Sequence, residues 1–324
     1  DPVVFVLCGT YLMHSENPAE KITMVSLIAA VILSGRALAP LGQIAGLATR
    51  FQQARVALQG VNTIVERPIE RSPDRQYISL DYMQGSIVFN RVVFGYQKET
   101  PPALKEFNLR IQPGEKVGIL GRIGSGKTTM LKLAAGLYEA QQGNVCIDDV
   151  DTRQLDPSYL RNQVVLLNQS PRLFLGTLRE NMDLGRSDGF SSDQDLLQAL
   201  QRFGLAGIIR SHPRGLDMPL GEDGLGLSGG QKQIVALARL TLKQPRVVLL
   251  DEPTTGLDQG TENMALRAVA EWARDKTLVV VTHRPQVLQI VNRIVVVDGG
   301  QVVMDGPRDA VLKKLMENET AAQQ

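Results

Sequence analysis

A glycine-rich segment in the first half of the chain places the strongest constraint on its fold. Residues 121–128 read Gly-Arg-Ile-Gly-Ser-Gly-Lys-Thr, which fits the pattern G-x-x-x-x-G-K-[ST]. They follow the apolar run Val-Gly-Ile-Leu and precede a segment with the composition of a helix. This order of strand, loop and helix is the setting of a phosphate-binding P-loop. Backbone amides around Gly121, Gly124 and Gly126 can surround phosphate oxygens, and the helix start adds its positive dipole end.

The side chains at the end of this loop complete the predicted phosphate site. We expect Lys127 to reach the terminal phosphates and the Thr128 hydroxyl to bind Mg²⁺. Ser125 and Thr129 lie on either side of these two residues and belong to the same predicted nucleotide-binding set. The loop therefore predicts a site for a nucleotide together with Mg²⁺.

Two adjacent carboxylates follow a second apolar strand pattern further along the chain. Residues 247–250 read Val-Val-Leu-Leu, and Asp251 and Glu252 come directly after them. A buried strand that ends in carboxylates delivers them to the sheet edge where α/β folds bind their ligands. An isolated Asp-Glu pair is more often a solvated turn, but the aliphatic run and the upstream P-loop favour a catalytic role. We expect Asp251 to hold Mg²⁺ and Glu252 to polarise the attacking water.

A further glycine-rich element, Leu227-Ser228-Gly229-Gly230-Gln231, lies shortly before this strand. Together with the P-loop and the carboxylate pair, it makes the chain resemble exporters of the ATP-binding cassette (ABC) family. The resemblance implies that the chain is an ATP hydrolase whose cofactors are ATP and Mg²⁺. The resemblance places the four residues after the leucine in the nucleotide-binding set, with Ser228 and Gly230 presenting hydroxyl and amide donors to the γ-phosphate of an ATP held by a partner's P-loop. The resemblance therefore implies a head-to-tail homodimer with two ATP sites between the subunits.

The remaining motifs of the family occur in the expected order. The resemblance assigns adenine stacking to Tyr96, and assigns to Gln169 a contact with Mg²⁺ and the γ-phosphate and another with the membrane domain. It assigns a γ-phosphate contact to His283 and a place at the dimer seam to Asp258. Taken alone, Gln169 and His283 would be ordinary strand-end residues. Gly256 departs mildly from the family, which usually has alanine there.

Short aliphatic strands alternate with helical segments through most of the chain, which predicts an α/β fold. We expect a mainly parallel sheet flanked by helices, with a helical insertion over residues 178–218. Residues 85–324 are assigned to this nucleotide-binding domain, and the proline- and charge-rich stretch 68–84 to a linker. Residues 1–67 are assigned to the C-terminal part of an exporter transmembrane domain.

The first part of the chain is strongly apolar and predicts one to two transmembrane helices. Residues 22–48 are long enough to cross a hydrocarbon core of about 30 Å, whereas 2–13 suffice only as the end of a longer helix. Arginines follow the longer run, so the positive-inside rule places the rest of the chain in the cytoplasm. Arg36 either faces the bundle interior, a partner carboxylate or a water-filled pathway, or it snorkels toward the cytoplasmic interface. Residues 50–65 are expected to form an amphipathic helix packed on its neighbours.

Composition excludes two other classes of protein. Charged residues make up 21% of the chain and the net charge is +1, so no electrostatic footprint for nucleic acid is present. The two cysteines, Cys8 and Cys146, lie far apart, which indicates a reduced compartment with neither a disulfide framework nor a zinc site.

The type of exporter is assigned from segments that are less specific than the motifs above. Residues 33–43 and 291–306 resemble type I secretion ATPases that export adhesins and RTX proteins, and imply an unfolded polypeptide substrate. They also imply a periplasmic adaptor, an outer-membrane channel and a bacterial inner-membrane location. Glu222 resembles an acidic residue that couples the ATPase to the membrane domain in the exporter branch. The alternative is that Glu222 is an acidic residue in an exposed turn with no such role. Exporters of lipids, drugs or peptides remain an alternative, and a soluble ATP-driven clamp is disfavoured by the apolar run. The family's half-transporters have further spanning helices, so we expect a C-terminal fragment.

Overall fold

The computed structural model describes residues 2–14, 23–67, 69–73, 75–97, 99–185 and 192–322. The chain divides into two compact units, residues 1–72 and 73–324, which are described separately. The functional limits expected from the sequence, 1–67, 68–84 and 85–324, stay predictions.

The first unit consists of two helices, α1 (Pro2–Met13) and α2 (Met24–Val65), which contact each other. The α2 helix begins after Thr23, whose side chain accepts a hydrogen bond from the backbone of Ser26. Its 42 residues form one continuous helix, whereas the sequence suggested separate segments at 22–48 and 50–65. No α2 residue is buried, so the expected packing of 50–65 on neighbouring helices is not seen within the described residues. The polar segment expected to form the turn between α1 and α2 lies mostly outside the described residues.

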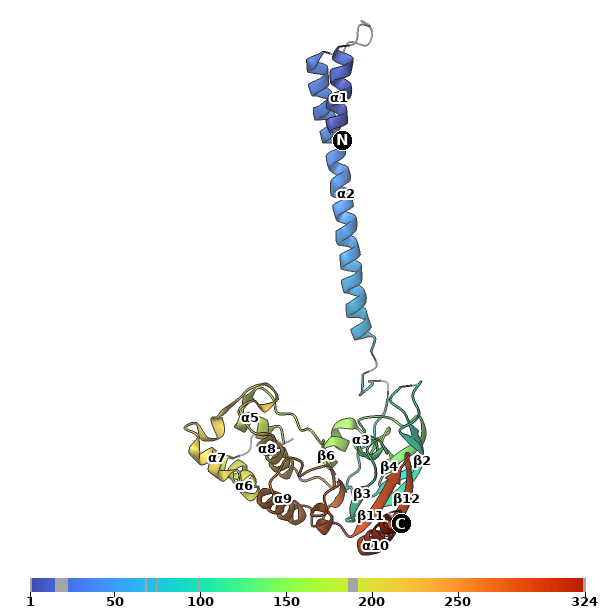
Figure 1. Ribbon diagram of the computed structural model, residues 1–324, viewed down its shortest axis with the longest axis vertical. Helices are drawn as coiled ribbons and strands as arrows, with labels where there is room; N and C mark the ends of the chain where they lie inside the picture. The colour runs from blue at the N-terminus through green and yellow to red at the C-terminus, as the bar shows by residue number, and fades with distance from the viewer. Residues whose placement is uncertain are drawn as a thin grey trace. The chain divides into compact units, whose positions relative to one another are not determined.

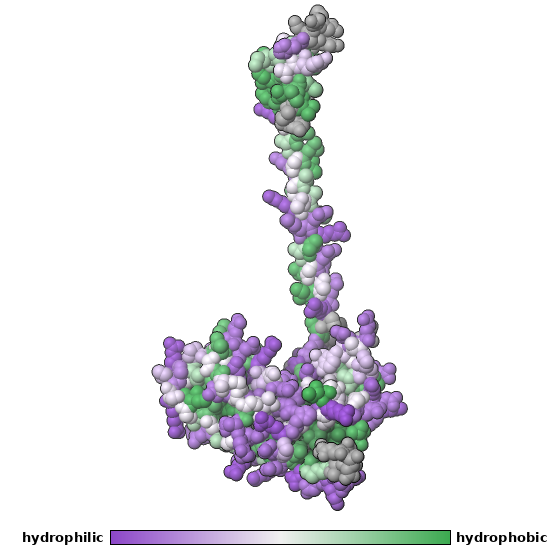
Figure 2. All heavy atoms as spheres, in the orientation of Figure 1, coloured by the Kyte–Doolittle hydropathy of each residue, from purple (hydrophilic) through white to green (hydrophobic). Residues whose placement is uncertain are grey.

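Apolar residues gather over α1 and the beginning of α2, and polar residues appear along its later part (Figure 2). In the described part of the chain, α2 is the one helix long and apolar enough to cross a membrane. At 1.5 Å per residue, a helix of this length extends over about 60 Å, roughly twice the thickness of a hydrocarbon core. A span at its start would therefore leave the second half of α2 in the aqueous phase.

The second unit contains the expected mainly parallel sheet. Its order is β12-β11-β3-β10-β9-β6, and every neighbouring pair is parallel except β11 with β12. Strands β9 and β10 are buried at every position, as expected for central strands covered on both faces. The strands are β3 (Lys116–Leu120), β6 (Val164–Leu167), β9 (Val247–Asp251), β10 (Thr277–Val281), β11 (Arg293–Asp298) and β12 (Gln301–Pro307).

A smaller antiparallel sheet packs beside it and was not predicted from the sequence. Its order is β2-β1-β4-β5, with register shifts in β1 where the ladder bulges. Buried side chains of this sheet, of β3 and of α3 form one continuous apolar cluster, so the two sheets share a core around the P-loop helix. The strands are β1 (Ile87–Phe94), β2 (Leu104–Ile111), β4 (Gln142–Ile147) and β5 (Val150–Asp151); a separate pair is β7 (Gly176–Thr177) and β8 (Pro219–Leu220).

The helices of the second unit form two groups. The expected insertion over 178–218 is helical in its described part, with residues 186–191 outside it, and α5 to α8 lie together away from α3 (Figure 1). Buried residues of α5, α6 and α8 form a second apolar cluster with β6, β9 and α9. The helices are α3 (Lys127–Ala134), α4 (Pro157–Gln163), α5 (Leu178–Asp183), α6 (Asp193–Arg202), α7 (Ala206–Ser211), η1 (Gly215–Asp217), η2 (Glu222–Gly224), α8 (Gly229–Thr241), α9 (Gln259–Trp272), η3 (Val287–Ile290) and α10 (Arg308–Ala322).

Candidate nucleotide-binding site

Most of the predicted site residues follow strands that end at one edge of the parallel sheet. Val281 of β10 pairs with Asp251 of β9 on one side and with Ile119 of β3 on the other. On β6, Leu167 pairs with Leu250. The P-loop, the carboxylate pair, Gln169 and His283 all follow these positions, so the parallel register brings together motifs that are far apart in the sequence.

Two of the P-loop glycines, Gly121 and Gly126, are required by close backbone contacts. A Cβ atom on Gly121 would lie 2.0 Å from the carbonyl oxygen of Val297, and one on Gly126 would lie 2.6 Å from that of Ala103. Gly126 precedes α3 with a φ of 101°, in a region that other residues rarely adopt. The loop can therefore close against β11 and β2 only with glycine at these positions.

Lys127 is bound to the loop that it closes. Its Nζ donates to the carbonyl oxygens of Gly121, at 2.7 Å, and Arg122, at 2.8 Å. Burial lowers the pKa of Lys127, and the nearby Glu252 and Asp251 carboxylates act in the opposite direction. An entering phosphate would give this buried ammonium a stronger anionic partner than the two carbonyls.

Thr128 and Asp251 meet directly. The Thr128 hydroxyl donates to Asp251 Oδ2 at 2.7 Å, and Asp251 is only 2% exposed. Burial raises the pKa of Asp251, while the Thr128 hydrogen bond and Lys127 lower it. A buried carboxylate beside a hydroxyl is the kind of oxygen donor set that suits a hard cation. No cluster of three or more His, Cys, Asp or Glu side chains exists in the described residues, so such a cation would also need phosphate or water oxygens.

Glu252 points to a different partner from its neighbour Asp251. Glu252 has a φ of 48°, unusual for a residue with a side chain, and its Oε1 lies 3.7 Å from His283 Nε2. Burial raises the pKa of Glu252, and the adjacent His283 lowers it. The backbone turn thus separates two consecutive carboxylates, so that Asp251 meets Thr128 and Glu252 meets His283.

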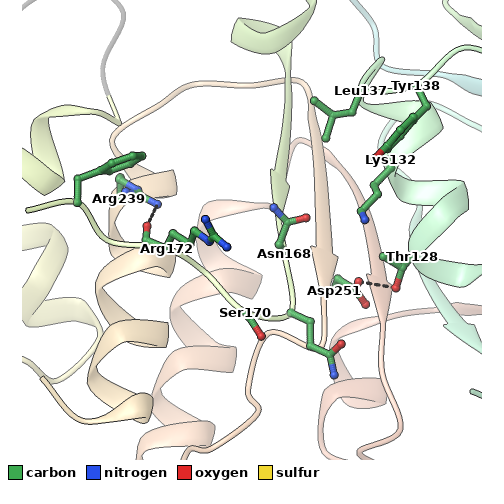
Figure 3. A pocket seen from close by; sticks show the side chains of 11 residues that line it. Thr128, Lys132, Leu137, Tyr138, Asn168, Ser170, Arg172, Arg239 and Asp251 are labelled. Carbon is green, nitrogen blue, oxygen red and sulfur yellow. Dashed lines mark hydrogen bonds between the residues drawn. The ribbon is translucent and has the colours of Figure 1, made fainter. Parts of the chain in front are cut away.

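A cavity of about 630 Å³ opens beside this edge of the sheet (Figure 3). Gln169, Thr128 and Asp251 all line this cavity, and their predicted role in holding a metal stays a prediction. Figure 3 shows Thr128 and Asp251 on one side and Arg172 and Arg239 on the other, where Arg239 donates to the Arg172 carbonyl oxygen at 3.4 Å. The cavity is lined by Thr128, Lys132, Leu137, Tyr138, Asn168, Gln169, Ser170, Arg172, Phe174, Arg239 and Asp251.

Tyr96 lies beside the P-loop helix within a group of aromatic rings. Its hydroxyl is 3.2 Å from Thr129 Oγ1, and its ring centroid lies 5.2 Å from Phe94 and 5.4 Å from Tyr138. Lys132 Nζ lies 5.8 Å from the Tyr96 centroid. Tyr96 is half exposed, so a ring face remains accessible to a base. Neither Tyr138 nor Lys132 belongs to a motif with its own spacing, and sequence reasoning missed both.

The signature residues and Asp258 act as helix caps. Ser228 Oγ accepts from Gln231 N at 3.3 Å, and Gln231 Oε1 accepts from Ser228 N at 2.8 Å, which makes a capping box. Asp258 caps α9 by accepting from the backbone and hydroxyl of Thr261, which lowers its pKa. A Cβ atom on Gly230 would lie 2.9 Å from the Gly256 carbonyl oxygen. The cavity that contains Thr128 and Asp251 does not include these residues, whose action on a partner's nucleotide stays a prediction.

Comparison with known proteins identifies the motif-bearing part of the chain. Residues 104–255 match the profile of the family described as ABC transporter. The cyclolysin secretion/processing ATP-binding protein CyaB of Bordetella pertussis is 35% identical over 298 residues, covering 92% of this chain and 41% of CyaB. An ATP-dependent lipid A-core flippase of Neisseria gonorrhoeae is 35% identical over 274 residues, covering 85% of this chain and 43% of the flippase.

A solved structure agrees with these similarities. A bacterial Atm1-family ABC exporter with ATP bound superposes with a TM-score of 0.77 at 27% identity, covering 99% of this chain and 56% of that protein. The chain spans less than half the length of the two curated relatives. The α/β domain that carries the P-loop, the carboxylate pair and the signature is therefore an ABC transporter ATPase domain, preceded by one long apolar helix.

Proposed function

We propose that this chain is the ATP-hydrolysing part of an exporter that moves an unfolded polypeptide across the bacterial inner membrane within a type I secretion system. The observation that carries the chemical half of the proposal is the separation of the two carboxylates, Asp251 toward Thr128 and Glu252 toward His283. One carboxylate is thus available for a metal and the other for a water.

ATP binding is assigned to the P-loop and to the aromatic group beside it. Lys127 would exchange its carbonyl partners for the terminal phosphates, and the amides of residues 121–129 would surround the phosphate oxygens. Tyr96 offers a partly exposed ring to the adenine. Thr128, Asp251 and Gln169 fit Mg²⁺ as oxygen donors, and bound Mg²⁺ would neutralise charge on the phosphates.

Hydrolysis is assigned to Glu252 and His283. Glu252 is mostly buried, and the raised pKa that follows from burial makes it a stronger base than a solvated glutamate. We propose that it orients and deprotonates the attacking water, while His283, which is half exposed, contacts the γ-phosphate. Gln169 lines the cavity next to Asp251, where it can respond to both metal and phosphate.

A homodimer would complete each site. Ser228 and Gly229 are exposed at the start of the 13-residue α8 helix, so their hydroxyl and amide groups are accessible to a partner's ATP. Gly230, Gln231 and the exposed Asp258 belong to the same proposed interface. No nucleic-acid partner is proposed, because the net charge is only +1.

The membrane location and the polypeptide cargo go beyond the ATPase domain. The α2 helix supports an inner-membrane anchor with the ATPase domain in the cytoplasm, and it disfavours a soluble clamp. Among the relatives, the secretion protein aligns over 298 residues and the flippase over 274, at equal identity. Lipid export is therefore the second candidate. A secretion exporter would also need a periplasmic adaptor and an outer-membrane channel.

Deletion of the full-length gene tests the cargo. The secreted proteome should lose one or a few large adhesins or toxins, and complementation with the unmodified gene, but not with a Glu252→Gln gene, should restore them. Increased sensitivity to drugs or altered surface lipid with an unchanged secreted proteome would replace polypeptide secretion by the small-molecule alternative.

A further inference from the structure

The proposed catalytic residues Glu252 and His283 lie on two different loops. The distance between their side chains therefore depends on the contacts that hold each loop. Glu252 follows β9 and His283 follows β10; their side chains are 3.7 Å apart, and the Glu252 carboxylate also accepts a hydrogen bond from the His283 backbone. The Glu252 amide donates to the Val281 carbonyl oxygen at 2.9 Å, which aligns the two backbones but does not orient the side chains. The supports of the two loops therefore bear on the geometry of the pair.

One buried carboxylate on α9 contacts both loops. Glu262 is 3% exposed, and its Oε1 accepts from the Thr254 hydroxyl at 2.6 Å and pairs with Arg284 Nη1 at 2.9 Å. Thr254 lies two residues after Glu252, and Arg284 is the immediate neighbour of His283. A single oxygen atom thus joins the segment that carries the proposed base to the segment that carries the proposed phosphate contact.

Separate hydrogen bonds hold the loop after β9 and the loop after β10, and Glu262 connects the two loops. The amide side chain of Gln233, on α8, donates to the carbonyl oxygens of Pro253 at 3.0 Å and Glu252 at 3.4 Å. On the other loop, the Arg284 amide donates to Thr282 Oγ1 at 3.0 Å. Each loop is thus held by its own hydrogen bonds, and the Glu262 carboxylate links Thr254 of one loop to Arg284 of the other.

The buried Glu262–Arg284 ion pair costs desolvation free energy. A buried ion pair contributes little net stability compared with apolar packing, and its best-supported use is to specify one arrangement of the groups around it. The Arg284 side chain is 37% exposed and that of Glu262 is 4% exposed, so the pair joins a partly exposed guanidinium to a buried carboxylate. This geometry suits positioning of the loop that carries His283.

We propose that Glu262 is a positioning residue that, through Thr254 and Arg284, sets the separation of Glu252 and His283 and thereby the rate of ATP hydrolysis. The inference rests on the proposed roles of Glu252 and His283. It concerns the rate of turnover after ATP has bound, because neither Glu262 nor Arg284 lines the cavity beside the P-loop.

The test uses the full chain purified in detergent. Glu262→Gln keeps an oxygen for the Thr254 hydroxyl but removes the ion pair; Arg284→Lys keeps the charge but not the reach of the guanidinium. Glu271→Gln, an exposed acid on the same helix, is the matched control. Turnover is counted per bound ATP analogue, so that an unfolded fraction does not contribute. We expect turnover to fall about tenfold or more in both variants with less than a twofold change in the KM for ATP, and no change in the control.

A second readout separates positioning from mere stability. The chain has three histidines, so ¹³C-histidine NMR with a His283→Gln reference assigns the His283 ring resonance. That resonance should move in Glu262→Gln and Arg284→Lys but stay in place in Glu271→Gln. The double variant Glu262→Gln/Arg284→Lys should be no slower than either single variant, because all three lose the same interaction.

The outcomes discriminate between the two proposals. If Glu252→Gln abolishes turnover while both Glu262→Gln and Arg284→Lys retain it, positioning by Glu262 is wrong and the proposed hydrolysis stands. If Glu262→Gln does not fold, wild-type turnover and an unmoved His283 resonance in Arg284→Lys overturn the inference by themselves. If Glu252→Gln itself keeps wild-type turnover, the proposed catalytic roles fail.

Discussion

Substitution of Gly121 by alanine separates steric contact from backbone conformation in the P-loop. Gly121 has a φ of 149°, and an added Cβ atom would lie 2.0 Å from the Val297 carbonyl oxygen, far inside contact distance. Gly114 has a φ of 77°, and an added Cβ atom there would have no atom within 4 Å. Gly114→Ala therefore incurs only the left-handed backbone cost, about 1–2 kcal/mol. Gly121→Ala adds overpacking of about 1–3 kcal/mol, because rigid β11 backbone must move.

The difference between the two variants is measurable by thermal unfolding. For a domain of this size, each kcal/mol shifts the Tm by about 2–4 °C, so Gly121→Ala should unfold about 2–12 °C below Gly114→Ala. Fluorescent ATP binding should weaken in Gly121→Ala and stay unchanged in Gly114→Ala, whose turn lies outside the P-loop. Equal Tm values for the two variants, or unchanged nucleotide affinity in Gly121→Ala, would refute the close-contact reasoning.

Further predictions concern the parts of the composite site. Lys127→Ala should lose nucleotide binding, and mixing it with Ser228→Arg chains should restore some ATPase activity, because one complete site can form per heterodimer; failure of mixed dimers to hydrolyse ATP contradicts the in-trans geometry. Tyr138→Ala should raise the KM for ATP about two- to tenfold, the range that loss of one aromatic pair gives, while Tyr138→Phe should leave the KM near the original value. A KM in Tyr138→Ala equal to that of the unmodified chain would show that Tyr138 does not support Tyr96. Thr128→Val should raise the Mg²⁺ concentration needed for half-maximal hydrolysis, measured by Mg²⁺ titration, and an unchanged requirement would exclude Thr128 as a ligand.

Local motifs predicted the parallel sheet, and they placed several candidate site residues at the ends of its strands. The P-loop, the Asp251-Glu252 pair and Gln169 each follow a strand with a buried apolar pattern, and the parallel register places these strand ends together. The sequence also predicted His283 as a phosphate contact. It did not predict the 3.7 Å approach of His283 to Glu252, because that distance depends on the left-handed turn at Glu252.

Features that depend on long-range pairing were missed. The antiparallel sheet joins β1 to β4 across the P-loop segment, and neither strand carries a motif that identifies its partner. Tyr138 lies in a bend after α3 and Arg239 and Glu262 lie on helices; none belongs to a motif in sequence, and only the packed structure shows what each contacts. The continuous α2 helix was divided in the prediction because its hydropathy changes along its length, although its helical conformation does not.

The central claim is that Glu252 activates the water that attacks ATP at a site closed by a second chain. Its most direct test is ATP turnover and size-exclusion chromatography of Glu252→Gln, with Glu271→Gln as the control. We expect Glu252→Gln to bind ATP normally, to lose turnover by about 10²-fold or more, as removal of a general base does, and to elute as an ATP-stabilised dimer. The control should match the unmodified chain. Turnover by Glu252→Gln near that of the unmodified chain would contradict the account.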